Sequence, residues 1–373
     1  KEALVFIRRV VISAVVFFAL AQPFKIFASL LPGVTEIRPV NVVPPVLGIL
    51  FGLPAAVGVA LGELVSDILF GSNAFICITG LIANFLYTYL PYRMWYTEFN
   101  PKGRATPPNL SSMKDVLKFI VIMFMNSLLV TILLMLIFET AGFGPSGDTA
   151  PLLFFNNFDF SMILGVPLLS ILANSKIVPQ IPKKKEKTGK RTAFLRITSV
   201  LPYVISAVGI VYFCLSKFGG IGAKPEIALS FMIVFTLLLI IYVLRPFTLD
   251  IDAMVKKKLR FSIKAKVTVG FLITAVVFIA FVFSSTYGSV TMNGEIERLA
   301  LVNHIYLVVG IAINIIFGIT ILALWYVESK ITTPIEMISK LVDEFAGQDH
   351  LGENDNQKLK EMCNSIQKST KDE

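Results

Sequence analysis

The sequence predicts an all-α polytopic membrane protein with about ten transmembrane helices, followed by a cytoplasmic pair of helices at the C-terminal end. Of its 373 residues, 55% are apolar and only 16% are charged, whereas soluble domains average about 45–50% apolar and about 25% charged residues. The apolar residues form long uncharged runs, and the charged residues are grouped between them. Lipid is therefore the expected solvent for much of the chain, because about 20 consecutive apolar residues cross a bilayer as a helix.

Ten apolar runs are candidates for these helices. They cover residues 3–31, 43–51, 54–70, 74–95, 116–138, 152–173, 194–215, 227–244, 267–283 and 301–327. The second run is short and contains Pro44 and Pro45, so an alternative interpretation joins it to the third run as one bent hairpin. The first run is too long for the apolar part of a signal peptide, and we expect it to be retained as a span.

The distribution of Lys and Arg predicts that both termini lie on the cytoplasmic side of the membrane. Cytoplasmic loops carry an excess of these residues, and with the N-terminus inside every second loop is rich in them. These inside segments hold Arg8, Arg9, Arg93, Lys102, Arg104, Lys114, Lys183, Lys184, Lys185, Lys187, Lys190, Arg191, Lys256, Lys257, Lys258, Arg260, Lys264 and Lys266. The opposite loops have few, mainly Arg38, Lys217, Lys224 and Arg298. Because this pattern explains the net charge of +9, we expect membrane lipids and no nucleic acid as partners.

Linkers divide the chain into five parts. Residues 1–182 form a six-span ligand-binding domain, 183–192 a basic linker, 193–245 a two-span helical hairpin, 246–328 a basic linker and the final transmembrane pair with a short outside loop, and 329–373 a signalling module. The chain begins without Met and stops just after a helical pattern, so we expect it to be a fragment of a longer protein.

Polar residues in the first domain predict a ligand pocket in the outer half of the membrane. Polar groups inside spans are expensive, so each one is a functional candidate. With the N-terminus inside, polar residues of several spans are expected at a similar depth near the outer surface of the membrane. Glu36 and Glu139 are expected at about the same depth. The candidate ligand-binding residues are Arg38, Asn41, Glu63, Asp67, Asn84, Asn156, Asn157 and Asp159. The alternative interpretation is a set of interfacial residues that face lipid headgroups or bond within their own helices.

Neither a metal site nor a cofactor is expected. The three cysteines, Cys77, Cys214 and Cys363, lack metal-ligand spacing, and the two histidines are isolated. Two glycine pairs have a structural interpretation instead: Gly48 and Gly52, and Gly58 and Gly62, are each spaced by four residues, which allows close helix packing.

Two segments of the first domain resemble the substrate-binding S components of energy-coupling-factor vitamin transporters. They are Arg38-Pro-Val-Asn41-Val-Val-Pro44-Pro45-Val-Leu-Gly48-Ile-Leu-Phe-Gly52 and Gly62-Glu63-Leu-Val-Ser-Asp67. The resemblance covers about residues 1–180 and implies six helices, both termini inside, and capture of a vitamin-like molecule in an outward-facing pocket. The first predicted helix departs from the family, because Ala14 is followed four residues later by Phe18 and not by a second small residue. This departure disfavours docking to a transport partner.

The C-terminal segment resembles the end of a transmembrane sensor. Residues 262–272 resemble the opening helix of bacterial chemoreceptors and sensor kinases, and Ile331-Thr-Thr-Pro334-Ile-Glu336 resembles the start of a HAMP signalling module. The resemblance implies a signalling role for Pro334 and Glu336. Apolar residues at helical spacing form two seams: Ile335, Ile338, Leu341, Val342 and Phe345, then Leu359, Met362, Cys363 and Ile366.

Two such amphipathic helices are half of a four-helix bundle, so the seams predict a homodimer. The alternative is an amphipathic tail on the membrane surface. The face opposite the first seam argues against it, because Glu336, Asp343 and Glu344 would not be attracted to anionic lipid.

These observations predict a membrane receptor, and the resemblances imply that it belongs to the bacterial cytoplasmic (inner) membrane. It would bind a small molecule in the outward-facing pocket and relay the signal through the HAMP module to an output domain beyond this chain. The layout is similar to the membrane regions of bacterial SpoIIE-like serine/threonine phosphatases and some sensor kinases; the chain itself contains none of their catalytic residues. The alternatives are the S component of a vitamin-type uptake transporter, and a first domain that serves only as a membrane anchor.

Overall fold

The computed structural model describes residues 2–27, 29–31, 35–36, 38–97, 112–143, 149–173, 197–222 and 224–245, together with isolated single residues. The chain divides into two compact units, Lys1–Arg260 with Val269–Ile311, and Phe261–Thr268 with Ala312–Glu373. All described helices and strands belong to the first unit. The second unit contributes only Asn314, Ile315, Gly318, Ile335 and Ile338, each with helical backbone.

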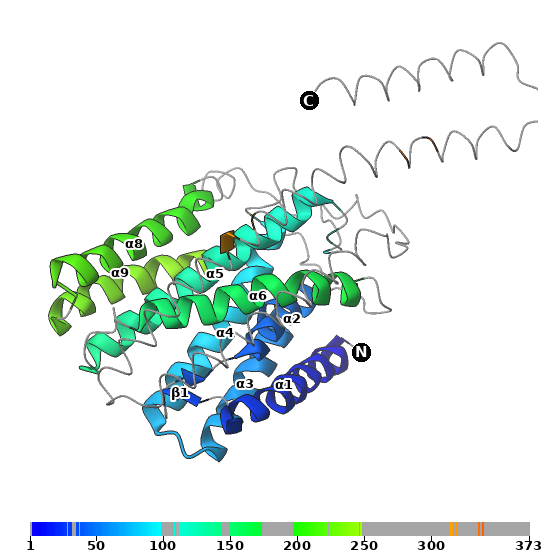
Figure 1. Ribbon diagram of the computed structural model, residues 1–373, viewed down its shortest axis with the longest axis horizontal. Coiled ribbons are helices and arrows are strands. Elements are labelled where there is room, and N and C mark those ends of the chain that lie inside the picture. Colours follow the sequence, from blue (N-terminus) through cyan, green and yellow to red (C-terminus); the bar gives the residue numbers. More distant parts are fainter. Residues whose placement is uncertain are drawn as a thin grey trace, which may run out of the picture. The chain divides into compact units, whose positions relative to one another are not determined.

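The first unit is a bundle of helices with one small hairpin of strands (Figure 1). Its elements are α1 (Glu2–Phe27), β1 (Ser29–Leu31), β2 (Thr35–Glu36), the 3-10 helix η1 (Pro39–Val42), α2 (Val43–Phe51), α3 (Leu53–Leu69), α4 (Ala74–Tyr96), α5 (Met113–Thr140), α6 (Ala150–Ala173), the 3-10 helix η3 (Thr198–Val200), α8 (Leu201–Gly219) and α9 (Pro225–Leu244). The predicted all-α class is therefore confirmed apart from the antiparallel pair β1–β2, which no sequence pattern indicated.

Six helices in the described part of the chain are long and apolar enough to cross a membrane. They are Glu2–Lys25, Ala74–Tyr96, Met113–Thr140, Ala150–Ala173, Thr198–Gly219 and Pro225–Leu244. For α4, α5, α6 and α9 the predicted bounds agree with the structure to within three residues. The predicted span at 267–283 lies outside the described residues, as do Pro334 and Glu336. Of the predicted span at 301–327 and the HAMP-like module, only the five single residues named above are described.

The second and third predicted spans are helices of the expected bounds, but both are short. Helix α2 has nine residues and α3 has 17, and nine residues rise only about 14 Å at about 1.5 Å per residue. Gly52 alone joins the two helices, with a φ of 65°. A side chain there would be strained and would also press on the Tyr92 ring, which lies 2.7 Å from the position of an added Cβ. The structure thus favours the bent-hairpin interpretation of residues 43–70.

The contacts of four glycines show how the first four helices are oriented relative to one another. Gly58 lies against Val10 and Ser13 of α1 and Gly62 against Ala14, so α1 and α3 run in the same direction. Gly48 lies against Thr88 and Gly52 against Tyr92, so α2 and α4 run in the same direction as each other. The predicted role of these glycines in close helix packing is confirmed.

The first-unit bundle has two chemically different ends. At one end Arg9 lies 5.0 Å from the Phe51 ring centroid and Lys118 lies 4.0 Å from that of Trp95. Arg93 at the same end donates to the backbone oxygen of Arg245. We call this the basic end. The opposite end, where α1 and α3 finish and α4 and α6 begin, holds the candidate site and is called the pocket end.

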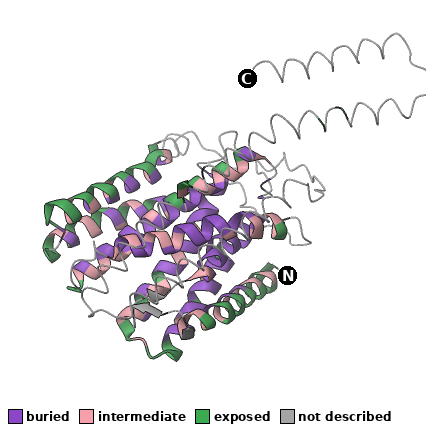
Figure 2. Cartoon of the chain, in the orientation of Figure 1, coloured by how far each residue is buried: buried purple, intermediate pink, exposed green. Residues whose placement is uncertain are grey.

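Apolar side chains cover the outer surface of the bundle. In Figure 2 exposed residues dominate α1, α8 and α9, whereas α2 and the middle of α5 and α6 are buried. The exposed residues include large apolar side chains such as Leu4, Ile7, Val211 and Leu237. Soluble proteins rarely expose apolar surface so continuously. Together with the six long apolar helices, this surface indicates a membrane protein.

Candidate functional site

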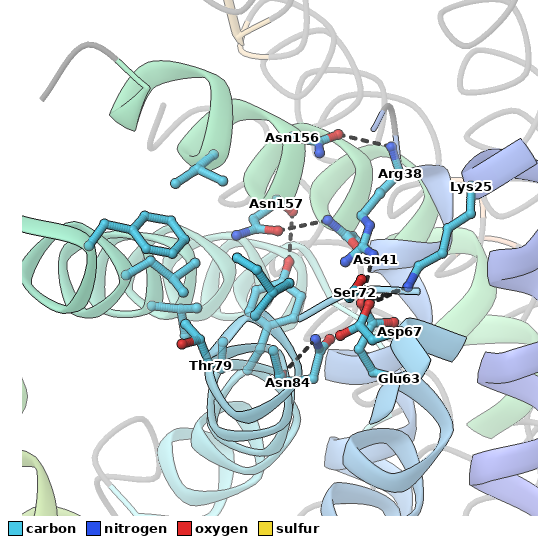
Figure 3. A pocket seen from close by; sticks show the side chains of 18 of the residues that line it. Lys25, Arg38, Asn41, Glu63, Asp67, Ser72, Thr79, Asn84, Asn156 and Asn157 are labelled. Carbon is cyan, nitrogen blue, oxygen red and sulfur yellow. Dashed lines mark hydrogen bonds and ion pairs between the residues drawn. The ribbon is translucent and has the colours of Figure 1, made fainter. Parts of the chain in front are cut away.

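A cavity of about 220 Å³ lies at the pocket end of the bundle, between α1, α3, α4, α5, α6 and the residues that lead into η1 (Figure 3). Its wall is formed by Lys25, Arg38, Asn41, Glu63, Asp67, Phe70, Ser72, Ile76, Thr79, Gly80, Ala83, Asn84, Tyr87, Val130, Leu134, Phe138, Leu153, Asn156 and Asn157. The cavity thus combines residues that are far apart in the sequence, and its wall has a charged side, an amide side and an apolar side.

The charged side is a row of four alternating charges, Asp67, Lys25, Glu63 and Arg38, which we call the charged row (Figure 3). Lys25 Nζ lies 2.5 Å from Asp67 Oδ1 and 3.6 Å from Glu63 Oε1. Arg38 Nη2 donates to the same Glu63 Oε1 at 2.6 Å. All four side chains are largely buried, with Arg38 the most exposed at 16%. Burial of charges at this depth is tolerable because each has an opposite charge in contact.

Local structure explains how the row forms. Glu63 and Asp67 are four residues apart on α3, so they lie on one face of that helix. The close contact of Gly58 and Gly62 with α1 brings Lys25, near the end of α1, beside both carboxylates. Gly80 of α4 completes the arrangement, because a Cβ there would lie only 2.8 Å from Asp67 Oδ2. A larger residue at position 80 would push α4 away from the row.

The amide side fixes the segment that carries Arg38. Asn156 Oδ1 accepts from the backbone N–H of Arg38 at 3.0 Å, and Asn41 Nδ2 donates to Asn157 Oδ1 at 2.7 Å. The Tyr87 hydroxyl donates to the backbone oxygen of Asn157 at 2.7 Å. These bonds connect η1, α4 and α6, so the position of the Arg38 guanidinium depends on residues of three different elements.

The apolar side lies mainly on α5. Val130, Leu134 and Phe138 follow one another at helical spacing and face the cavity, with Ile76 of α4 and Leu153 of α6 beside them. A wall of this kind offers contact surface and excludes water, while the few polar groups fix the orientation of a bound molecule.

Seven of the eight predicted ligand-binding residues line this cavity: Arg38, Asn41, Glu63, Asp67, Asn84, Asn156 and Asn157. Asn84 lies in the wall with its Nδ2 donating to the Gly80 backbone oxygen at 3.0 Å. The eighth, Asp159, is buried on α6 but does not line the cavity. Asp159 is three residues beyond Asn156 on α6, so at about 1.5 Å per residue it lies about 4–5 Å further along the helix from the pocket end. The depth in the membrane that the sequence predicted for Asp159 did not reveal this difference.

Two further acidic residues were expected at a similar depth. Glu139 is buried in the contact between α5 and α8, where its Oε1 accepts from Ser216 Oγ at 3.0 Å. The side chain of Glu36 lies outside the described residues. The sequence reasoning also missed Lys25 and Tyr87. Lys25 could have been found, because a lysine at the outer end of the first span is an exception to the expected charge distribution; Tyr87 has no such signal.

Among the residues that the structure describes, no group of three or more His, Cys, Asp or Glu side chains is placed to hold a metal ion. The two carboxylates of the cavity are instead paired with Lys25 and Arg38. What the arrangement can do chemically is hold a small polar molecule by charge and hydrogen bonds on one side and by apolar contact on the other.

Comparison of the chain with protein-family models, with curated proteins and with solved structures finds no match. The resemblances to S components and to HAMP modules therefore stay predictions that depend on the sequence segments quoted above.

Proposed function

We propose that this protein is a bacterial membrane receptor, which binds a small molecule in the cavity at the pocket end and relays its presence to the cytoplasm. The observation that carries the proposal is the charged row beside a cavity: four ionisable side chains in contact, largely buried, in a membrane bundle. Ionisable groups inside membrane helices are costly and mark binding or transport sites far more often than packing.

The distribution of charge supports an outward-facing cavity. Arg9, Arg93, Lys118 and Arg245 lie at the basic end, and positive residues favour the cytoplasmic side. A cytoplasmic basic end puts the pocket end outside, and the start of α1 and the end of α9 inside.

A relay needs an element that contacts both the cavity and the later helices, and α4 has this property. It contributes Asn84 and Tyr87 to the cavity wall. Arg93, near the end of the same helix, donates to the backbone oxygens of Tyr242 and Arg245 at the end of α9. A shift of α4 on ligand binding would therefore act on the C-terminal end of α9, which leads toward the predicted signalling module.

In this proposal the last helices form a homodimer through the seams that begin at Ile335 and Leu359, and Pro334 and Glu336 take part in signalling. The ligand must favour one of two arrangements of these helices, because a ligand with equal affinity for both shifts nothing. An output domain beyond this chain would receive the signal.

The second candidate function is uptake, with the first domain acting as an S component. The cavity at the outer end of the first domain is compatible with it. One observation disfavours it: Ser13 and Ala14, the small residues in the middle of α1, already pack against Gly58 and Gly62 of α3. They are therefore not available to a transport partner. A third possibility, that the first domain is only an anchor, gives no reason for the buried charged row.

The experiment that tests these functions is purification of the full chain from membranes under mild conditions, followed by crosslinking through Cys363 and identification of associated subunits. The receptor predicts a crosslinked dimer without an ATPase or a transmembrane coupling subunit. Capture of both of those subunits would instead establish uptake. An anchor predicts that neither transport subunit is captured and that no small molecule raises the melting temperature of the purified chain.

A further inference from the structure

The charges of the charged row sum to zero, because two cations, Lys25 and Arg38, face two anions, Glu63 and Asp67. A ligand with a net charge would add an uncompensated charge to a buried site, which is unfavourable at low dielectric. A ligand that carries both charges can exchange partners with the row and leave the sum unchanged.

A second observation indicates that the ligand carries a hydrogen-bond donor for Glu63. Both cations contact the same oxygen of Glu63, Oε1. The other oxygen, Oε2, is buried and has no hydrogen-bond partner among the described groups, and Glu63 is only 2% exposed. An ionised carboxylate can accept several hydrogen bonds, and a buried acceptor left without one is costly. Glu63 belongs to the cavity wall, so a ligand N–H group is well placed to complete it.

The rest of the cavity wall and the cavity volume indicate the size and polarity of the remaining part of the ligand. The α5 side is apolar, with Val130, Leu134 and Phe138. The volume of about 220 Å³ is below the roughly 300–1,000 Å³ of pockets for drug-sized molecules. The occupant is therefore small, with a polar head and an apolar body.

We propose that the cavity binds a small zwitterion of the amino-acid type. Its carboxylate pairs with Arg38 and Lys25, its ammonium group pairs with Asp67 and Glu63, and its apolar side chain lies against α5. This inference depends on the proposed function, namely that the cavity holds a small molecule.

The test is a matched panel of probes against the full chain in nanodiscs, with binding measured by calorimetry and by the shift in melting temperature. Leucine carries both charges, isoamylamine only the positive charge, isocaproate only the negative charge, and isoamyl alcohol neither. Valine, methionine and phenylalanine, with their amine, acid and alcohol analogues, extend the panel to other body sizes. We expect the best zwitterion to bind more tightly than either of its singly charged analogues by about tenfold or more.

Two outcomes count against the inference in different ways. If an amine, an acid or an alcohol binds as tightly as its zwitterion, the ligand class is wrong while the proposed small-molecule site stands. If no compound of any class binds, the small-molecule site itself fails, and the zwitterion inference fails with it.

Variants of the row give a sharper readout, because a ratio of affinities within one variant does not depend on how much of the protein is folded. Arg38→Gln removes a positive charge, so the preference for leucine over isoamylamine should fall by about tenfold. Asp67→Asn removes a negative charge, so the preference for leucine over isocaproate should fall by a similar factor. Glu139→Gln is the matched control, since Glu139 is a buried acid that does not line the cavity, and it should change neither ratio. Unchanged ratios in both row variants would overturn the proposal.

Discussion

At the scale of single residues, Glu63 is the member of the charged row that contacts both cations, Lys25 and Arg38. Its Oε1 accepts from Arg38 at 2.6 Å and lies 3.6 Å from Lys25 Nζ. The Glu63→Gln variant keeps the shape of the side chain but leaves both cations without this counter-charge. Removal of one partner from a buried ion pair typically costs about 3–5 kcal/mol. We expect a decrease of that order in the free energy of unfolding, measured by denaturant unfolding of the chain in detergent.

The control for this prediction is Glu226→Gln. Glu226 is exposed in the first turn of α9, so its replacement should change the free energy of unfolding by less than about 1 kcal/mol. Equal losses in the two variants would mean that the row contributes nothing specific to stability.

Gly48 gives a second prediction at this scale, because it permits α2 to lie directly against α4. An added Cβ at position 48 would lie 1.8 Å from the backbone oxygen of Thr88, and a backbone atom cannot move aside without moving its helix. We expect Gly48→Ala to lower the free energy of unfolding by about 1–3 kcal/mol, as overpacking of a core usually does. Thermal unfolding in nanodiscs measures the effect.

Gly219→Ala is the matched control for Gly48→Ala. The nearest atom to an added Cβ at position 219 is 3.6 Å away, an ordinary contact, and Ala is the better helix former by about 1 kcal/mol. This variant should be as stable as the original chain or slightly more stable. A destabilised Gly219→Ala together with an unaffected Gly48→Ala would contradict the packing argument.

At the scale of elements, α4 connects the cavity to α9 through Arg93. The Arg93 side chain is 1% exposed, donates to the backbone oxygens of Tyr242 and Arg245, and lies 4.0 Å from the Phe247 ring centroid. The last carbonyl groups of a helix have no partner within the helix, so Arg93 supplies the missing donors. Its planar guanidinium can bond and stack at once, which a lysine cannot do.

We therefore expect Arg93→Met to loosen the end of α9 and Arg93→Lys to restore it only in part. Hydrogen–deuterium exchange of residues 240–245 should become faster in Arg93→Met, by about five- to thirtyfold for a loss of about 1–2 kcal/mol of local stability. Exchange in α3 serves as the internal control and should stay the same. Uniform acceleration across all helices would indicate global destabilisation and would remove the argument for a specific connection.

Elements also differ in how well the sequence predicted them. The sequence predicted α4, α5, α6 and α9 well, because each is a mostly apolar run of about 20 residues or more. The bounds of α2 and α3 were also predicted, but the sequence left open whether they form two spans or one bent hairpin, since that depends on the positive φ at Gly52. The β1–β2 hairpin has no pattern that could have predicted it, because its strands are three and two residues long.

At the scale of the whole molecule, the candidate site shows what topology can and cannot predict. Depth in the membrane was enough to select Arg38, Asn41 and Asn156, which the fold brings together at one end of the bundle. Depth estimated from the sequence does not resolve a single helical turn, and of Asn156 and Asp159, about one turn apart on α6, only Asn156 lines the cavity. Lys25 was missed for another reason: its pairing with Asp67 depends on the packing of α1 against α3, which the sequence alone did not establish.

The orientation of the bundle gives the last prediction. Ala74 begins α4 at the pocket end and is exposed, and Glu2 begins α1 at the basic end and is also exposed. In a background without the native cysteines, Ala74→Cys and Glu2→Cys would each offer one thiol to a maleimide that cannot cross the membrane. Because positive residues favour the cytoplasmic side, we expect intact cells to label Ala74→Cys only, and permeabilised cells to label both. Labelling of Glu2→Cys alone in intact cells would place the cavity on the cytoplasmic side, and a receptor for external molecules could not have that orientation.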